Sequence, residues 1–324
     1  MMTRDGFDTD LAASLSASLR ADLAGDDRAL SGVVPVLSHL LAFPGEALVS
    51  DDVIARMRGL IGGIARQFPA PDGEDAAAAK DGASAGAVDS LAATLAGNGG
   101  LMMHCYGLAV EGALTLKLSD TQGLDPVMSA LLKELIASKD DTIAELAMQF
   151  MASQSRFAEG QRRVDTPILE LPPWLFDEAV NIWKAWASGQ QIANIAAVET
   201  ELRGQYDEGR TRHSLLERLL GTLGASADVV CEIETAGLAI FASAIARGTQ
   251  QPRELIILSC QMQQNLRLAL ALKSCALTAE AIARQFAFLG HDIALPEGFD
   301  AWDDDDAAQL LANSSLSAKV EHNG

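Results

Sequence analysis

The stretch from residue 226 to residue 290 constrains the fold of this chain more than any other. Its residue pattern predicts three consecutive helices, and the middle helix, 252–273, is apolar on nearly every face. Pro252 suits the start of that helix, because proline at the first helical position forfeits no bonded N–H. One face would carry Leu255, Leu258, Met262, Leu266 and Leu270. A helix that is apolar on several sides needs neighbours to cover it, so this stretch predicts a helical core.

The composition extends this prediction to the whole chain. Of the 324 residues, 49% are apolar but only 5% are aromatic, and alanine and leucine supply much of the remainder. These two residues favour helices, and runs of β-branched residues are scarce. Paired helices with short turns recur from Asp125 onward without a fixed sequence period. We therefore expect an all-α protein, either a multi-helix bundle or an irregular helical-repeat array.

Four consecutive segments are expected along the chain. A helix marked by leucines at every fourth position, from Leu11 to Leu23, should end near Gly25, and another should begin at Asp27. Residues 69–86 contain no large apolar residue, which is typical of a linker or surface loop. The predicted segments are an N-terminal helical segment (1–68), a flexible linker or loop (69–86), a main helical domain (87–295) and an acidic C-terminal tail (296–324).

The net charge of −20 indicates which classes of partner are unlikely to bind to the surface. Phosphate backbones and anionic membranes should repel it, so we expect neither nucleic acid nor membrane as a partner. A protein with a basic surface fits better, and the oligomeric state stays open. The N-terminus has no apolar signal-peptide region, and the helix 101–118 contains His104, Glu111 and Lys117, which makes it too polar to span a bilayer. The sequence therefore predicts a cytoplasmic protein.

No pattern of residues indicates catalysis or metal binding. The four cysteines lie far apart without a CxxC spacing, which favours free buried thiols in a reducing compartment. No two of the five histidines share the i, i+4 spacing of paired metal ligands. His213 opens an amphipathic helix and is loosely similar to a phosphotransfer histidine, but a partly exposed helix-start histidine is the favoured interpretation. We expect no catalytic residue, metal or cofactor.

Amides within the apolar helix 252–273 are the candidate ligand-binding residues. Gln261, Gln264 and Asn265 would share one side of that helix, and buried amides need hydrogen-bond partners. Together with His104 they would line a polar pocket. The alternative, which we favour, is that they mark the strip where the helix meets solvent, since these residue types are mostly exposed.

Aromatic and acidic residues form the candidate partner-binding set. Trp174 and Trp186 lie near Trp183, which fits a buried stripe, and we expect the first two closer to the surface, where tryptophan often anchors an interface. In the tail, two aromatic residues adjoin an acidic run: Phe299, Trp302, Asp303, Asp304, Asp305 and Asp306. The tail would either dock onto its own chain or bind a basic groove on a partner.

Three stretches carry a family resemblance: 237–272, 295–299 and the Leu-Pro-Pro-Trp-Leu-Phe start at 171–176. They resemble alphaproteobacterial helical proteins of unknown function, which implies a helical, bacterial, cytoplasmic protein and carries no catalytic residue across. The leading hypothesis is a non-catalytic interaction or scaffold protein, or a regulatory adaptor. The alternative is a helical sensor that binds a small molecule near helix 252–273.

Overall fold

The computed structural model describes residues 4–32, 51–69, 82–223, 227–261, 264–299 and 302–314. Over these ranges the chain forms α-helices and two short 3-10 helices, with no β-strand, so the all-α prediction is confirmed. Within the same ranges, none of the helices combines the length and the apolar character that crossing a bilayer requires.

The chain divides into two compact units, and each is assembled from separate stretches. Unit 1 comprises Met1–Val33, Thr115–Lys133 and Leu223–Gly324, and unit 2 comprises Val34–Leu114 and Glu134–Thr222. This division differs from the consecutive segments that we expected. The reason is that helices distant in sequence share a hydrophobic core, which a linear pattern of composition does not report.

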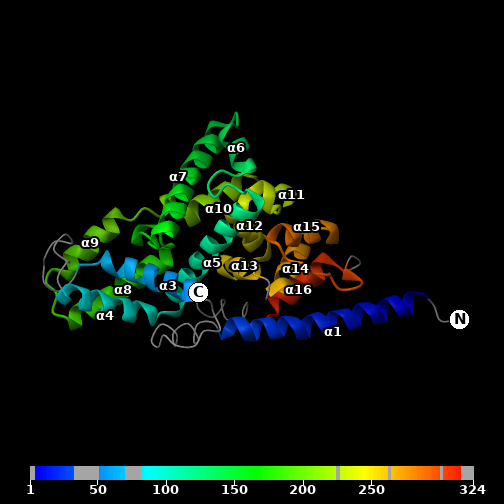
Figure 1. Cartoon of the computed structure of the whole chain (residues 1–324), viewed down its shortest axis with the longest axis horizontal. Helices are drawn as coiled ribbons and strands as arrows, with labels where there is room; N and C mark the ends of the chain where they lie inside the picture. Colours follow the sequence, from blue (N-terminus) through cyan, green and yellow to red (C-terminus); the bar gives the residue numbers. More distant parts are fainter. Residues whose placement is uncertain are drawn as a thin grey trace. The chain divides into compact units, whose positions relative to one another are not determined.

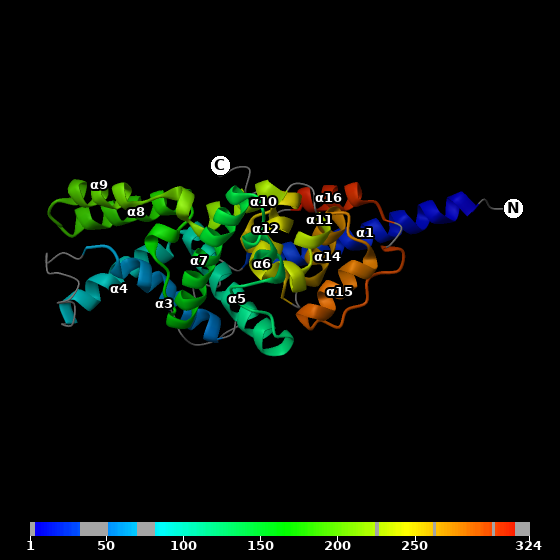
Figure 2. The same ribbon diagram turned by 90° about the horizontal axis from the view of Figure 1, so that it is seen from above.

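In unit 1, helix α14 lies at the centre of the packing. It contacts α1, α12, α13, α15 and α16, and Figures 1 and 2 show α1 running alongside the unit with its N-terminal end extending past α15 and α16. Residues 268–272 of α14 are all buried, as expected for a helix with neighbours on several sides. The helices of the unit are α1 (Arg4–Ser31), α11 (Ala227–Val230), α12 (Ile233–Thr249), α13 (Arg253–Ser259), α14 (Asn265–Ser274), α15 (Ala279–Leu289) and α16 (Asp304–Ala312), together with parts of α5 (Gly99–Gln122) and α6 (Ala130–Ile136).

Three helix boundaries differ from the sequence prediction. The expected helix 252–273 is two helices, because α13 ends at Ser259 and α14 begins only at Asn265. The helix expected from 226 is interrupted after α11, and α12 kinks at Gly237, which has a positive φ of 77° close to Ser129. At the N-terminus, α1 continues through Gly25 as one helix, so the predicted break there is wrong.

In unit 2, helices α3, α4 and α8 form a packed group. Helix α4 contacts both α3 and α8, and the ring of Phe68 stacks on that of Trp183 with centroids 5.4 Å apart. Trp183 is fully buried, as its position in the apolar stripe predicted. The helices of this unit are α3 (Asp51–Arg66), α4 (Gly82–Ala96), α7 (Asp141–Arg163), α8 (Pro173–Gly189), α9 (Ile195–Gln205) and α10 (Arg212–Leu223), together with the remaining parts of α5 and α6 and with 3-10 helices at Ile168–Glu170 and Glu208–Arg210.

The predicted linker 69–86 falls mostly outside the described residues. The last five residues of this segment, 82–86, form the beginning of α4. Alanine and serine in this stretch are compatible with a helix, although they supply little apolar surface of their own.

A buried histidine at the end of α15 should make the stability of unit 1 depend on pH. Burial, and to a smaller extent the charge of Lys117, lowers the pKa of His291 below its ordinary value of 6.5. The unfolded chain therefore binds more protons than the folded chain once the pH falls below about 6.5, so stability falls as the pH decreases. We expect His291→Gln to lose less stability than the wild type between pH 7.5 and 5.5 in urea unfolding. An equal loss in the two proteins would contradict this assignment.

Candidate functional site

The glutamine-rich segment lies at the junction of α13 and α14, not along one helix face. Gln261 is half-buried in the bend after α13, Gln264 caps the start of α14, and Asn265 is its first residue. The prediction that these three share one side of a continuous helix is therefore wrong. Gln264 is nonetheless only 7% exposed. Its Oε1 and the Oδ1 of Asn265 are buried and accept no hydrogen bond from the described residues.

The fourth predicted ligand residue belongs to the other unit. His104 lies on α5 within the part of that helix assigned to unit 2, whereas the three amides belong to unit 1. Neither unit by itself contains the predicted four-residue pocket. The alternative interpretation, in which the amides face solvent, also does not hold for Gln264, because its side chain is buried.

A buried arginine next to these amides holds helix α1 in place. The side chain of Arg267 is fully buried and forms an ion pair with Asp27 of α1, which is itself almost fully buried. Arg267 also donates hydrogen bonds to Gln251 (3.1 Å) and to Ser314 (3.4 Å). These contacts fix α1 and Ser314, two residues after the end of α16, to the start of α14.

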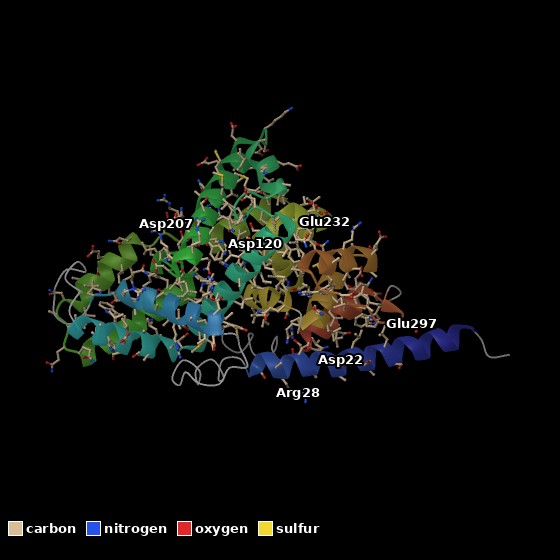
Figure 3. All side chains as sticks on the ribbon, in the orientation of Figure 1. Asp22, Arg28, Asp120, Asp207, Glu232 and Glu297 are labelled. Atoms are coloured by element: carbon tan, nitrogen blue, oxygen red, sulfur yellow. The ribbon has the colours of Figure 1, made fainter. Side chains whose placement is uncertain are left out.

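The pKa values around Arg267 reflect the low polarity of this position. Burial lowers the pKa of Arg267, against the opposing effect of Asp27. Burial likewise raises the pKa of Asp26, which is half-buried on the same turn of α1. By contrast, Asp22 and Arg28 lie on α1 with exposed side chains (Figure 3). At this contact, Asp27 forms the ion pair with the guanidinium, and Asp26 acts on it electrostatically.

A second buried arginine organises unit 2. Arg212, at the start of α10, forms an ion pair with Glu111 of α5 and donates to Gln154 of α7 at 2.8 Å. Its guanidinium carbon lies 3.8 Å from the centroid of the Phe157 ring, in reach of a cation–π interaction. The backbone N–H of Arg212 donates to Glu170. Three helices are therefore joined at the residue where α10 begins.

Trp174 is an exposed aromatic residue close to the contacts of Arg212. It lies in the first turn of α8 with 53% of its surface exposed. Its ring meets the ring of His213 edge to face, with centroids 5.3 Å apart. His213 directly follows Arg212, so the buried ion pair limits how far it can move. The half-buried state of His213 agrees with the favoured interpretation of a helix-start histidine.

Tyr206 packs against the beginning of the same helix, α8. Its hydroxyl donates to the carbonyl of Leu171 at 2.9 Å, just before α8. Its ring stacks on Phe176 with centroids 4.0 Å apart. We name the surface formed by Trp174, Asp177, Glu178 and His213 the tryptophan platform. The carboxylates of Asp177 and Glu178 lie about one helical turn after Trp174 on α8.

The remaining partner-binding candidates are less accessible. Trp186 is half-buried, and its indole N–H donates to Ser90 at 3.1 Å. Phe299 is 1% exposed and Trp302 7%, so the described part of the tail follows the intramolecular alternative and packs α16 on α14.

The acidic run of the tail has a role within unit 1. Asp303 caps α16 by accepting from the backbone N–H of Asp305, and acidic residues in a first helical turn favourably oppose the helix dipole. Asp304 forms an ion pair with Lys273 at 2.9 Å. Asp303, Asp305 and Asp306 keep exposed side chains. The run therefore stabilises its own helix and leaves only part of its charge to the surface.

Two cysteines that are far apart in the sequence interact in unit 1. A hydrogen bond with Cys231 lowers the pKa of Cys275, although burial opposes this change, and all four cysteines of the chain are present as thiols. Their positions, 231 and 275, match no short motif, so sequence spacing carries no signal for the contact. Among the described residues, no group of three or more histidine, cysteine or acidic side chains has the geometry of a metal site.

Comparison with known proteins identifies no relative of this chain. Neither the family models, nor the curated proteins, nor the solved structures include a match to this chain.

Proposed function

We propose that this chain is a non-catalytic helical interaction protein, a regulatory adaptor that binds another protein through the tryptophan platform of unit 2. The observation that carries the proposal is the 53% exposure of Trp174. Burying a large indole is favourable, and an exposed tryptophan is a frequent anchor of protein interfaces.

The charges of the platform favour a basic partner. Asp177 and Glu178 are both exposed beside Trp174. Asp177 forms an ion pair with Arg203, and Glu178 accepts a hydrogen bond from Asn98 at 2.8 Å, so both carboxylates are held in place. A lysine or arginine of a partner would contact the indole face by a cation–π interaction and these carboxylates by charge. The net charge of −20 acts in the same direction at longer range.

The rigidity of the platform lowers the cost of binding. The Arg212–Glu111 ion pair holds one edge, and the hydrogen bond from Tyr206 to Leu171 holds the other. A surface that is ordered before binding loses less side-chain entropy when the partner arrives. We therefore expect Trp174 to behave as an anchor residue whose truncation costs about 2 kcal/mol or more of binding free energy.

The test is to purify the chain gently from the cells that make it and to record native mass spectra. Wild-type protein should carry a second polypeptide, and Trp174→Ala should weaken that complex by about 30-fold, the equivalent of 2 kcal/mol. Met148→Ala is the matched control, because Met148 is 47% exposed on α7 of the same unit. It should leave the complex unchanged, and added salt should weaken the complex if the partner is basic.

Two outcomes would overturn the proposal. A complex that survives Trp174→Ala as well as it survives Met148→Ala would remove the platform from the interface. A small-molecule mass in place of a polypeptide would favour the sensor hypothesis instead. In that case Gln264→Ala should abolish the added mass, because the unpartnered oxygen of Gln264 would be the natural ligand contact.

A further inference from the structure

Helix α9 is attached to α8 although it buries none of its own residues. Among its eleven residues, Ile195–Gln205, none is buried. Ile195, Val198 and Leu202 lie on one face at positions i, i+3 and i+7, and each is only half-buried. The helix nevertheless contacts α8 (Figure 2). Because little apolar surface is removed from water, the hydrophobic effect contributes little to this contact.

Two ion pairs of partly exposed side chains join the two helices. Lys184 of α8 lies 2.6 Å from Glu199 of α9, and Asp177 of α8 lies 2.5 Å from Arg203 of α9. Arg203 also pairs with Glu199, one turn before it on α9, at 3.0 Å. Hydrogen bonds from Lys184 and then from Arg203 lower the pKa of Glu199 below its ordinary value. The attachment of α9 to α8 therefore depends largely on charge.

The chain is anchored at one end of α9 and turns sharply at the other. Tyr206, the residue after α9, stacks on Phe176 with ring centroids 4.0 Å apart and donates its hydroxyl to the carbonyl of Leu171. Before α9, Gln191 and Asn194 both have a positive φ, 58° and 60°, which produces a turn and not a continuation of α8. Helix α9 can therefore loosen from α8 without releasing the segment that follows it.

The ion pair between Asp177 and Arg203 belongs to the tryptophan platform. Asp177 lies three positions after Trp174 on α8, and its side chain is 56% exposed. In the free protein Arg203 neutralises much of this charge, so a basic group of a partner must compete with it. Once displaced, Arg203 keeps its contact with Glu199. The exchange replaces one exposed ion pair by another and leaves no buried charge without a partner, so its cost is small.

We propose that α9 is a strap that regulates the tryptophan platform. Arg203 occupies Asp177 in the free protein, and an arginine of a partner takes its place, which detaches α9 from α8 on the side of the platform. An arginine suits this exchange because its guanidinium pairs with a carboxylate and stacks on an indole, and Trp174 is exposed one turn from Asp177. The partner step rests on the proposed function, whereas the attachment of α9 by charge does not.

The first experiment measures hydrogen exchange in the full-length chain at two salt concentrations. Raising sodium chloride from about 0.02 M to about 0.5 M shortens the screening length and should speed exchange of the α9 amides about threefold or more. Amides of α8 around the buried Trp183 should not change. At low salt, Arg203→Gln should by itself speed exchange in α9. The matched control Glu159→Gln removes an exposed ion pair of α7 in the same unit and should leave α9 unchanged.

The second experiment adds a hexa-arginine peptide at constant ionic strength. In the wild type the peptide should speed exchange in α9 about threefold, because its guanidinium groups compete with Arg203 for Asp177. Asp177→Asn lacks this carboxylate, so α9 should already exchange faster and the peptide should add nothing. Exchange in α9 that is insensitive to salt would overturn the strap. An equal response of the wild type and Asp177→Asn to the peptide would overturn the competition.

A third result separates the strap from the proposed function. In native mass spectra of the chain with its polypeptide partner, Arg203→Gln should strengthen the complex about threefold by removing the internal competitor, whereas Trp174→Ala weakens it. A complex that Arg203→Gln weakens would contradict the competition. If no polypeptide accompanies the chain, the proposed function fails, and the two exchange measurements still decide the strap because they need only the purified chain.

Discussion

Replacement of Asp27 by alanine is expected to lower the free energy of unfolding of unit 1 by about 3–5 kcal/mol. The change removes the carboxylate that compensates the fully buried guanidinium of Arg267, and an uncompensated buried charge is strongly destabilising. The remaining hydrogen-bond partners, Gln251 and Ser314, are neutral, and Asp26 acts on the guanidinium more weakly than Asp27 does. Helix α1 would also lose the contact that fastens it to α14.

Hydrogen exchange measured by mass spectrometry checks this prediction, because it reports α1 and α14 separately from unit 2. Peptides from both helices should exchange faster in Asp27→Ala. The matched control is Asp22→Ala, since Asp22 is exposed on the same helix (Figure 3) and surface substitutions usually change stability by less than about 0.5 kcal/mol. Equal effects of the two substitutions would show that the buried ion pair does not hold α1.

In unit 2, Glu111→Ala is expected to cost about 3–5 kcal/mol for the same physical reason. Glu111 is 1% exposed and is the carboxylate partner of Arg212. Without it, the guanidinium retains Gln154 and the face of Phe157, neither of which carries a charge. Because α10 begins at Arg212, the loss should also loosen the position of His213 in the tryptophan platform.

Tryptophan fluorescence in a urea titration measures this effect, because Trp174, Trp183 and Trp186 all belong to unit 2. The control is Glu201→Ala, an exposed acid on α9 of the same unit. The double variant Glu111→Leu, Arg212→Met should recover part of the loss, since apolar replacements of a buried ion pair are often neutral or stabilising. A double variant less stable than either single variant would contradict this account.

The helical class was predictable from the sequence, but the helix boundaries were only partly so. Alanine, leucine and the three-and-four periodicity favour helices over most of the chain, and the described residues confirm that class. The break before Asn265 falls among the amide residues of 261–265, which interrupt the apolar pattern. Amides alone do not distinguish a break from a strip of a continuous helix that faces solvent. Gly237 did carry a signal: glycine inside a helical pattern often marks a position that needs a positive φ.

The buried ion pairs could not be predicted from the sequence, for a different reason. Asp27 and Arg267 lie 240 positions apart, and Glu111 and Arg212 lie 101 apart, so no local spacing connects them. One residue of each pair did stand out by itself as a charge in an apolar stretch. Glu111 occurs within the apolar run 101–118, and Arg267 within the most apolar helix. Such isolated charges indicate a buried partner, although the sequence does not identify which residue it is.

The order in which the ribosome synthesises the chain affects when unit 1 can assemble. Asp27 leaves the ribosome 240 residues before Arg267, which at about 5–20 residues per second is roughly 12 to 48 s of translation. Unit 2 ends at Thr222, so its segments are all available while α1 still lacks α14. During that interval α1 lacks α14, which it contacts in the finished protein, so the burial of Leu19 and Leu23 is not yet complete. An incomplete chain therefore exposes apolar side chains of α1 that the finished chain buries, and chaperones or proteases can use them to distinguish unfinished molecules from finished ones.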